Sequence, residues 1–186
     1  MVATADDLRA RALRLLARRE YSRQELANKL LSKPAPRPAR RAPGNTRDVF
    51  EAFVVEKEPY VAPTEAEVHA LLDDLEKRKM LSDDRYAEMR IRLRAPRYGN
   101  TRLQQELAQK GIDRDTIAAV LADQPDELSR CRELWLKKFG RAPQDMNERM
   151  KQTRHLASRG FNMRVIQQVI RTAGANDDEL SDNMTA

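Results

Sequence analysis

The chain has 186 residues and a formal net charge of +6 at pH 7, with an isoelectric point near 9.7. Hydrophobic residues make up 40% and aromatic residues only 5%, a composition that favours helices over sheets. The single cysteine, Cys131, excludes a disulfide within the chain and a cysteine-based zinc site. Nowhere do about 18 apolar residues follow one another, so we expect no membrane span, and the cytoplasm is the expected location.

The first two predicted helices lie within residues 6–32. Leu8, Ala12 and Leu15 recur at helical spacing, which places one apolar stripe on a helix otherwise rich in arginine. Residues 22–25 are typical of a capping box, in which the Ser22 hydroxyl and the Glu25 carboxylate each accept from a backbone amide. A second helix is therefore predicted to begin after Ser22.

A segment rich in proline and arginine follows, from residue 33 to residue 63. Its prolines lack amide donors and its arginines repel one another, so we expect a flexible insertion. The apolar run 49–55 inside it leaves open whether it docks or stays loose. Helical periodicity resumes at a second capping box, Thr64 to Glu67, and ends near Lys79.

The next three predicted helices begin after Ser82. The first is expected to bury Tyr86, Met89 and Leu93 and to end at Pro96, because a proline disfavours helix in the residue before it. The second ends at a glycine, and an aspartate caps the short third.

The last three predicted helices begin after Pro125. Cys131 and Trp135 lie on the expected apolar face of the first, and the second spans about residues 143–159. Asn162 caps the third, and the acidic residues after it are expected to form a loose tail.

An internal repeat is the most specific signal. Residues 107–112 (LAQKGI) and 156–161 (LASRGF) share a Leu-Ala-x-basic-Gly-apolar pattern, and residues 26–30 (LANKL) form a partial third copy. An aromatic residue precedes each copy: Tyr21, Tyr98 and Phe139. Each copy predicts a three-helix unit, and such units can stack as an elongated, curved array that suits an extended partner.

We therefore predict an all-α protein of three tandem three-helix repeats. The repeats occupy residues 1–79, 80–123 and 124–174, with the insertion 33–63 in the first and an acidic disordered tail at 175–186.

Three further motifs carry a resemblance: residues 12–26 (ALRLLARREYSRQEL), 81–87 (LSDDRYA) and 106–112 (ELAQKGI). Their order resembles the RecX family of bacterial recombinase regulators over residues 6–32 and 64–173, and the insertion departs from it. The resemblance implies a modulator that binds the RecA filament on single-stranded DNA, in the filament groove, and mainly inhibits its ATPase, strand-exchange and coprotease activities in DNA repair and the SOS response. It also implies binding to single-stranded DNA, with double-stranded DNA as a further candidate.

Basic residues gather around the first-to-second helix turn of the second and third repeats. Each alone is typical of a solvated face, but together they predict a strip that binds phosphates or carboxylates. Tyr98 and Phe139 in those turns are interpreted as core anchors, with base stacking as the alternative. The candidate partner-binding or DNA-binding residues are Arg90, Arg94, Arg97, Arg102, Lys137, Lys138, Arg141, Arg149, Lys151 and Arg154.

Catalysis is not expected, because His69 and His155 lie in separate helices and no phosphate-binding loop or zinc motif is present. No cofactor, metal or small-molecule substrate is predicted. The acidic pairs 73–74 and 83–84 are interpreted as a solvated face and a helix cap. A base-reading helix at 113–121 is disfavoured, because its acidic start would face phosphates.

Two other functions stay open from the residues alone. The first is a non-sequence-specific DNA-binding or architectural protein that acts without RecA, which would lose affinity steeply with salt. The second is an adaptor for some other acidic protein, since the positive charge suits either partner.

Overall fold

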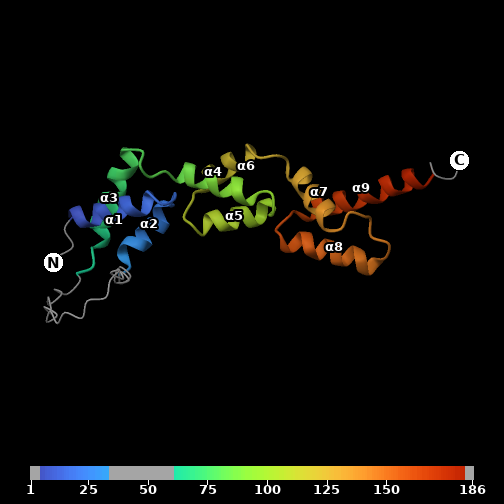
Figure 1. Cartoon of the computed structure of the whole chain (residues 1–186), viewed down its shortest axis with the longest axis horizontal. Coiled ribbons are helices and arrows are strands. Elements are labelled where there is room, and N and C mark those ends of the chain that lie inside the picture. The colour runs from blue at the N-terminus through green and yellow to red at the C-terminus, as the bar shows by residue number, and fades with distance from the viewer. Residues whose placement is uncertain (1–4, 34–60, 183–186) are drawn as a thin grey trace, which may run out of the picture. The chain divides into compact units, whose positions relative to one another are not determined.

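The computed structural model describes residues 5–33 and 61–182, and the regular structure in these ranges is entirely α-helical (Figure 1). The predicted all-α repeat fold is confirmed. The chain divides into two compact units, Met1–Leu81 and Ser82–Ala186. The interior of the predicted insertion, residues 34–60, lies outside the described residues together with its apolar run.

The first unit contains α1 (Ala5–Leu16), α2 (Arg23–Leu31) and α3 (Glu65–Lys77), each of which packs on the other two. Its core joins Leu8 and Ala12 of α1 to apolar residues of α2 and α3, as the helical spacing predicted. Burial of this stripe is the main stabilising contribution, because helices of this length are marginal by themselves.

Side-chain caps fix where the helices of the first unit begin. The Thr64 hydroxyl accepts from the Glu67 amide at 3.2 Å, and the Glu67 carboxylate accepts from the Thr64 amide at 2.8 Å, so this capping box is confirmed. Ser22 accepts from the Glu25 amide at 3.1 Å and starts α2 as predicted.

The acidic pair in α3 has a structural role. Asp73 pairs with Arg23 at 2.7 Å, and Asp74 pairs with Arg9 at 2.7 Å and with Arg78 at 2.9 Å. Arg23 also pairs with Glu76 at 2.6 Å, so these contacts connect α3 to α1 and α2 and set each of the three acids against an arginine. Among the described residues, no group of three or more His, Cys, Asp or Glu side chains could hold a metal ion.

The second unit begins with α4 (Asp83–Arg94), α5 (Asn100–Ala108) and α6 (Arg114–Ala122). Tyr86 and Ile91 of α4 are buried, whereas Leu93 is 67% exposed, so the prediction that Leu93 belongs to the buried face was wrong. Apolar residues lie on both sides of this short helix, and its packing against α6 selects the side that carries Tyr86, Ala87 and Ile91.

The remaining helices are α7 (Glu127–Lys138), α8 (Met146–Ser158) and α9 (Met163–Asp182). Cys131 and Trp135 are buried as expected. α8 begins three residues later than Pro143, because the Asp145 carboxylate caps it by accepting from the Glu148 amide at 2.7 Å. α9 continues to Asp182, so the helix extends into the segment 175–186 that was predicted to be a disordered tail.

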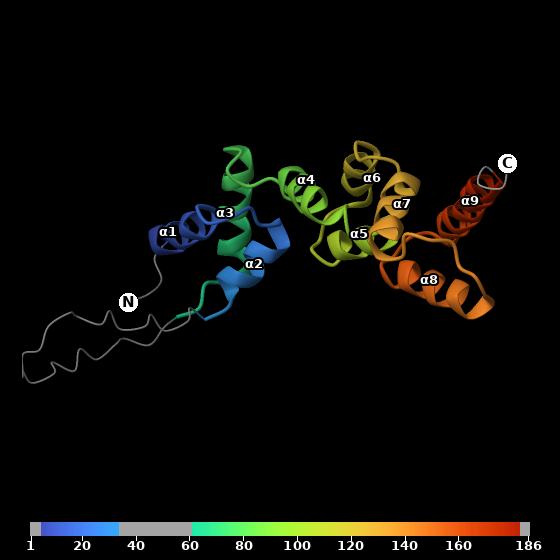
Figure 2. The same cartoon turned by 45° about the vertical axis from the view of Figure 1, so that its right-hand side comes forward.

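A close backbone contact joins the second and third repeats inside this unit. The Gly99 amide donates to the Arg159 carbonyl at 3.0 Å, and the Thr101 amide donates to the Gly160 carbonyl at 3.2 Å. A β-carbon on Gly99 would lie 2.3 Å from the Gly160 oxygen, so only glycine permits this approach. The contact brings the turn before α5 against the turn after α8 (Figure 2).

The first turn of α7 reinforces this joint. Arg130 is buried, and its guanidinium donates to the carbonyls of Ala95 at 3.1 Å and Tyr98 at 3.0 Å. Glu127 accepts from the amide of Asn100 at 2.9 Å. Side chains of Arg130 and Glu127 in the third repeat therefore form hydrogen bonds with backbone groups of the second repeat. These bonds fix the position of the basic residues of one repeat relative to those of the other.

Candidate functional site

The structure divides the predicted site residues into two kinds. Arg90 and Arg94 are half-buried, and the other eight are exposed. The exposed residues are Arg97, Arg102, Lys137, Lys138, Arg141, Arg149, Lys151 and Arg154. The sequence therefore placed most of them on the surface correctly, but their role in binding stays a prediction.

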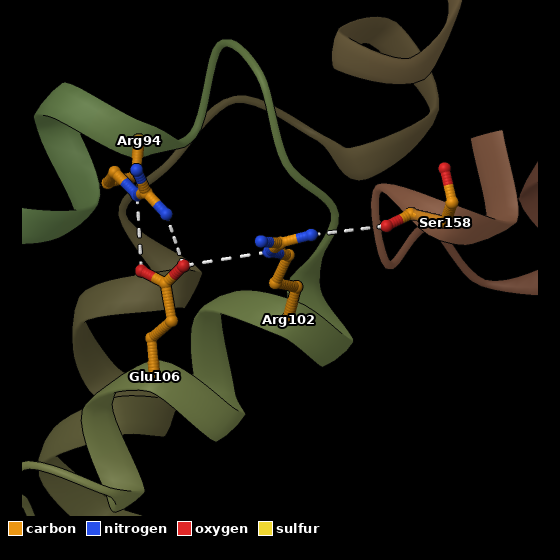
Figure 3. A network of polar contacts seen from close by, with 4 residues as sticks. All are labelled: Arg94, Arg102, Glu106 and Ser158. Atoms are coloured by element: carbon orange, nitrogen blue, oxygen red, sulfur yellow. Dashed lines mark hydrogen bonds and ion pairs between the residues drawn. The ribbon is translucent and has the colours of Figure 1, made fainter. Parts of the chain in front are cut away.

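Arg94 forms a paired contact with a carboxylate in the same repeat. Its Nε donates to Glu106 at 3.1 Å, and its Nη2 donates to the other oxygen of that carboxylate (Figure 3). The guanidinium also lies over the Tyr98 ring, 4.3 Å from its centroid. Arg94 is thus engaged inside the protein, and its charge is largely neutralised.

Two more arginines surround the same ring. The Arg102 guanidinium lies 4.5 Å from the Tyr98 ring centroid. It also lies 3.6 Å from the Glu106 carboxylate and donates to the Ser158 carbonyl at 3.3 Å (Figure 3). Arg159 of the third repeat lies 5.6 Å from the ring centroid. One carboxylate therefore serves several cations, and the cluster keeps an excess of positive charge.

The charges around Glu106 keep it ionised. Burial by itself would raise the pKa of Glu106, but hydrogen bonding to Arg94 and the charges of Arg94, Arg90 and Arg102 outweigh burial, so the pKa is lowered. Arg90 is therefore close enough to contribute to the lowered pKa of Glu106, and its role in binding stays a prediction.

The first repeat contains the same arrangement. The Arg19 guanidinium lies 3.9 Å from the Tyr21 centroid and donates to Glu25 at 3.1 and 3.3 Å. Tyr21 is buried, and Tyr98 and Phe139 are half-buried against the cores of their repeats, so the interpretation of Tyr98 and Phe139 as core anchors agrees with the structure. We call this arrangement of an arginine over a tyrosine and paired with a glutamate the Arg-Tyr-Glu triad.

The outer face of α8 carries an open groove of about 510 Å³. Its lining residues are Asn147, Met150, Lys151, Arg154, His155 and Ser158. Lys151 and Arg154 project their charges there, while Met150 adds an exposed apolar surface. We call this feature the α8 groove.

The other predicted cations flank this groove or lie apart from it. Lys137 and Lys138 end α7, and Arg149 lies on the exposed surface of α8. Arg141 pairs with Glu148 at 2.8 Å, which occupies part of its charge. The structure therefore brings Lys151 and Arg154 together but does not gather all six cations of the third repeat at one point.

Sequence reasoning missed three residues that organise these clusters. Arg159 was noted only as the basic position of a repeat motif, and Arg130 and Glu127 were not noted at all. Their neighbours are remote in sequence, as for Arg130 and Ala95, so no local spacing could have found them. The repeat itself was the available signal for Glu106, which matches Glu25 in the first copy.

The fold and the basic clusters define a class: a tandem three-helix repeat protein that presents charged helical surfaces. Three family models match this chain: RecX, first three-helix domain, at residues 9–37; RecX, second three-helix domain, at 82–121; and RecX, third three-helix domain, at 125–170. The chain belongs to the RecX family.

Relatives named Regulatory protein RecX match along nearly the whole chain. The protein from Chromobacterium violaceum is 40% identical over 182 residues, which cover 98% of this chain and 100% of that protein. The protein from Neisseria meningitidis is 34% identical, covering 89% and 90% of the two chains. The chain therefore has a regulatory role of the RecX kind.

Solved structures agree on the fold. A crystal structure of RecX from Lactobacillus salivarius matches with a TM-score of 0.65 and 18% identity, covering 92% of this chain and 97% of that one. Another structure of regulatory protein RecX matches with a TM-score of 0.63 and 19% identity, covering 89% of this chain and 72% of that one. Within the described residues, no helix is long and apolar enough to cross a membrane.

Proposed function

We propose that the chain binds the RecA filament assembled on single-stranded DNA and inhibits its ATPase, recombinase and coprotease activities, as a regulator of DNA repair and the SOS response. Membership in the RecX family supports the regulatory role. The supporting observation in the structure is that two acids of the second and third repeats are paired with arginines while several cations face solvent. Glu106 pairs with Arg94, and Glu148 pairs with Arg141.

The exposed cations form the proposed binding surface. Arg97, Lys151 and Arg154 are exposed on the two repeats that the glycine contact joins. The backbone that carries these charges is already ordered, so binding costs side-chain entropy but little backbone entropy, and this favours an ordered and repetitive target. A filament offers such a target, and a basic surface also speeds encounter with a polyanion.

The test is the single-stranded-DNA-dependent ATPase of RecA at substoichiometric amounts of this protein, repeated with DNA in excess. Inhibition that persists in excess DNA is expected for a filament regulator. Loss of inhibition with added DNA would favour the alternative of a general DNA-binding or architectural protein, because simple competition for DNA is then sufficient.

The ion pairs of the candidate residues decide which of them can be substituted in this test without destabilising the fold. Charge reversal at Arg94 is a poor choice, because it would place a second carboxylate against Glu106 and destabilise the fold. Arg97→Glu and Arg154→Glu alter exposed residues and should weaken inhibition. Arg164→Glu, at an exposed position of α9, makes the same change of charge and should leave inhibition unchanged.

A further inference from the structure

The three repeats differ at one charged position. The leucines Leu26, Leu107 and Leu156 correspond in the repeat pattern, and the residues before them are Glu25, Glu106 and His155. In the first two repeats this glutamate completes the Arg-Tyr-Glu triad. The third repeat has a histidine in its place.

The third repeat retains the aromatic residue of the arrangement, as Phe139. The Phe139 ring meets the His155 ring edge to face, with centroids 5.5 Å apart and an interplanar angle of 88°. Burial, and then the charges of Arg159 and Lys138, lower the pKa of His155. An aromatic residue and two cations therefore surround the position, but the carboxylate that neutralises cations in the other repeats is missing.

The space beside His155 is open. It is the α8 groove, to which Lys151 and Arg154 also contribute. Among residues 6–33 and 61–173, whose side chains the structure describes, Lys151 and Arg154 have no ion-pair partner. These charges therefore remain available to a ligand that enters the groove.

We propose that the α8 groove binds an acidic segment of a protein partner, whose carboxylate lies beside His155 and pairs with Lys151 and Arg154, because this repeat lacks the carboxylate that Glu25 and Glu106 supply in theirs. A carboxylate is favoured over a phosphate because the same position holds a carboxylate twice in this chain. Met150, which lines the groove and is 53% exposed, supplies an apolar contact that suits peptide side chains. The inference deepens the proposed function and rests on it for the partner being a protein.

The probe is a fluorescein-labelled glutamate-rich peptide, measured by anisotropy with the full chain, beside a labelled thymidine oligonucleotide of equal charge. His155→Glu supplies the missing carboxylate from within, so peptide affinity should fall by about tenfold or more. His155→Gln adds no carboxylate and should bind within about twofold of the natural chain. His69→Glu, on the exposed surface of α3, controls for the change in net charge.

A double variant, Lys151→Ala with Arg154→Ala, keeps the test informative if His155→Glu folds poorly, because both residues are exposed. It too should lose peptide binding. The proposal is overturned if the natural chain binds no peptide, if it binds the oligonucleotide in the groove instead, or if both the double variant and a folded His155→Glu variant bind the peptide normally.

The two proposals fail in different ways. Inhibition of RecA without peptide binding rejects the carboxylate groove and keeps the proposed function. Peptide binding without any effect on RecA keeps the groove and rejects the proposed function.

Discussion

Replacing Gly99 with alanine tests whether the close contact between the second and third repeats stabilises the unit. Gly99 has φ −78° and ψ 168°, a conformation that alanine adopts without strain. The added β-carbon would, however, lie 2.3 Å from the Gly160 oxygen and 2.4 Å from the Phe161 α-carbon. Both neighbours are backbone atoms, so the two turns must separate to admit it.

The cost follows from what the separation disrupts. The hydrogen bonds from the Gly99 and Thr101 amides are lost or lengthened, at about 1 kcal/mol each. Overpacking adds roughly 1–3 kcal/mol. We therefore expect Gly99→Ala to lower the free energy of unfolding by about 3–5 kcal/mol. Urea unfolding followed by circular dichroism measures the change.

Gly140→Ala is the matched control. Gly140 has φ +70°, but its added β-carbon would meet only the Leu136 oxygen, at 3.5 Å. Its cost is conformational alone, about 1–2 kcal/mol. If backbone conformation alone determined the cost, Gly140→Ala would destabilise the chain more than Gly99→Ala, because only Gly140 has a positive φ. If Gly99→Ala costs less than Gly140→Ala, the reasoning about the contact is wrong.

Three other predictions follow from buried groups. Arg130→Met leaves the Ala95 and Tyr98 carbonyls without their donor and should cost about 3 kcal/mol in urea unfolding, whereas the exposed Arg132→Met should change little. Burial raises the pKa of the Cys131 thiol to about 12, so iodoacetamide at mildly alkaline pH should label it only after unfolding, and rapid labelling of the folded chain would contradict this. The pKa of His155 is lowered in the folded chain, so the unfolded chain takes up a proton on this histidine at a higher pH than the folded chain does. The free energy of unfolding should therefore fall as the pH drops below about 6.5, and it should fall more in the natural chain than in His155→Gln. Equal pH profiles of stability for the two chains would contradict this.

Local signals in the sequence predicted local structure well. The capping box at Thr64 depends on residues three positions apart, and the turn glycines Gly111 and Gly160 have φ +79° and +82° as helix-ending glycines do. The buried face of α4 was mispredicted because the spacing of Tyr86, Met89 and Leu93 fits a helical stripe. The spacing of the residues that are actually buried, Tyr86, Ala87 and Ile91, fits a stripe equally well. Only the position of α6 distinguishes the two faces, and that position is tertiary information.

The candidate site was predictable as a surface but not as a set of contacts. Charge and repeat position identified Arg94 and Arg102, whereas their shared carboxylate depends on how α4 and α5 pack. Arg159 reaches Tyr98 only because the glycine contact brings the third repeat against the second. Interactions across repeats have no fixed sequence spacing, so periodicity carries no information about them.

Replacing His155 with glutamate tests whether the histidine of the third repeat, where the other two repeats have glutamate, serves folding or binding. His155→Glu would gain attraction to Lys138 and Arg159, which offsets the unfavourable effect of an acid in the last turn of α8. We therefore expect its free energy of unfolding at neutral pH to lie within about 1 kcal/mol of the natural chain or above it. A larger loss would mean that folding requires the histidine. Equal or greater stability together with lost peptide binding would mean that folding tolerates a carboxylate here, so the open position serves the partner.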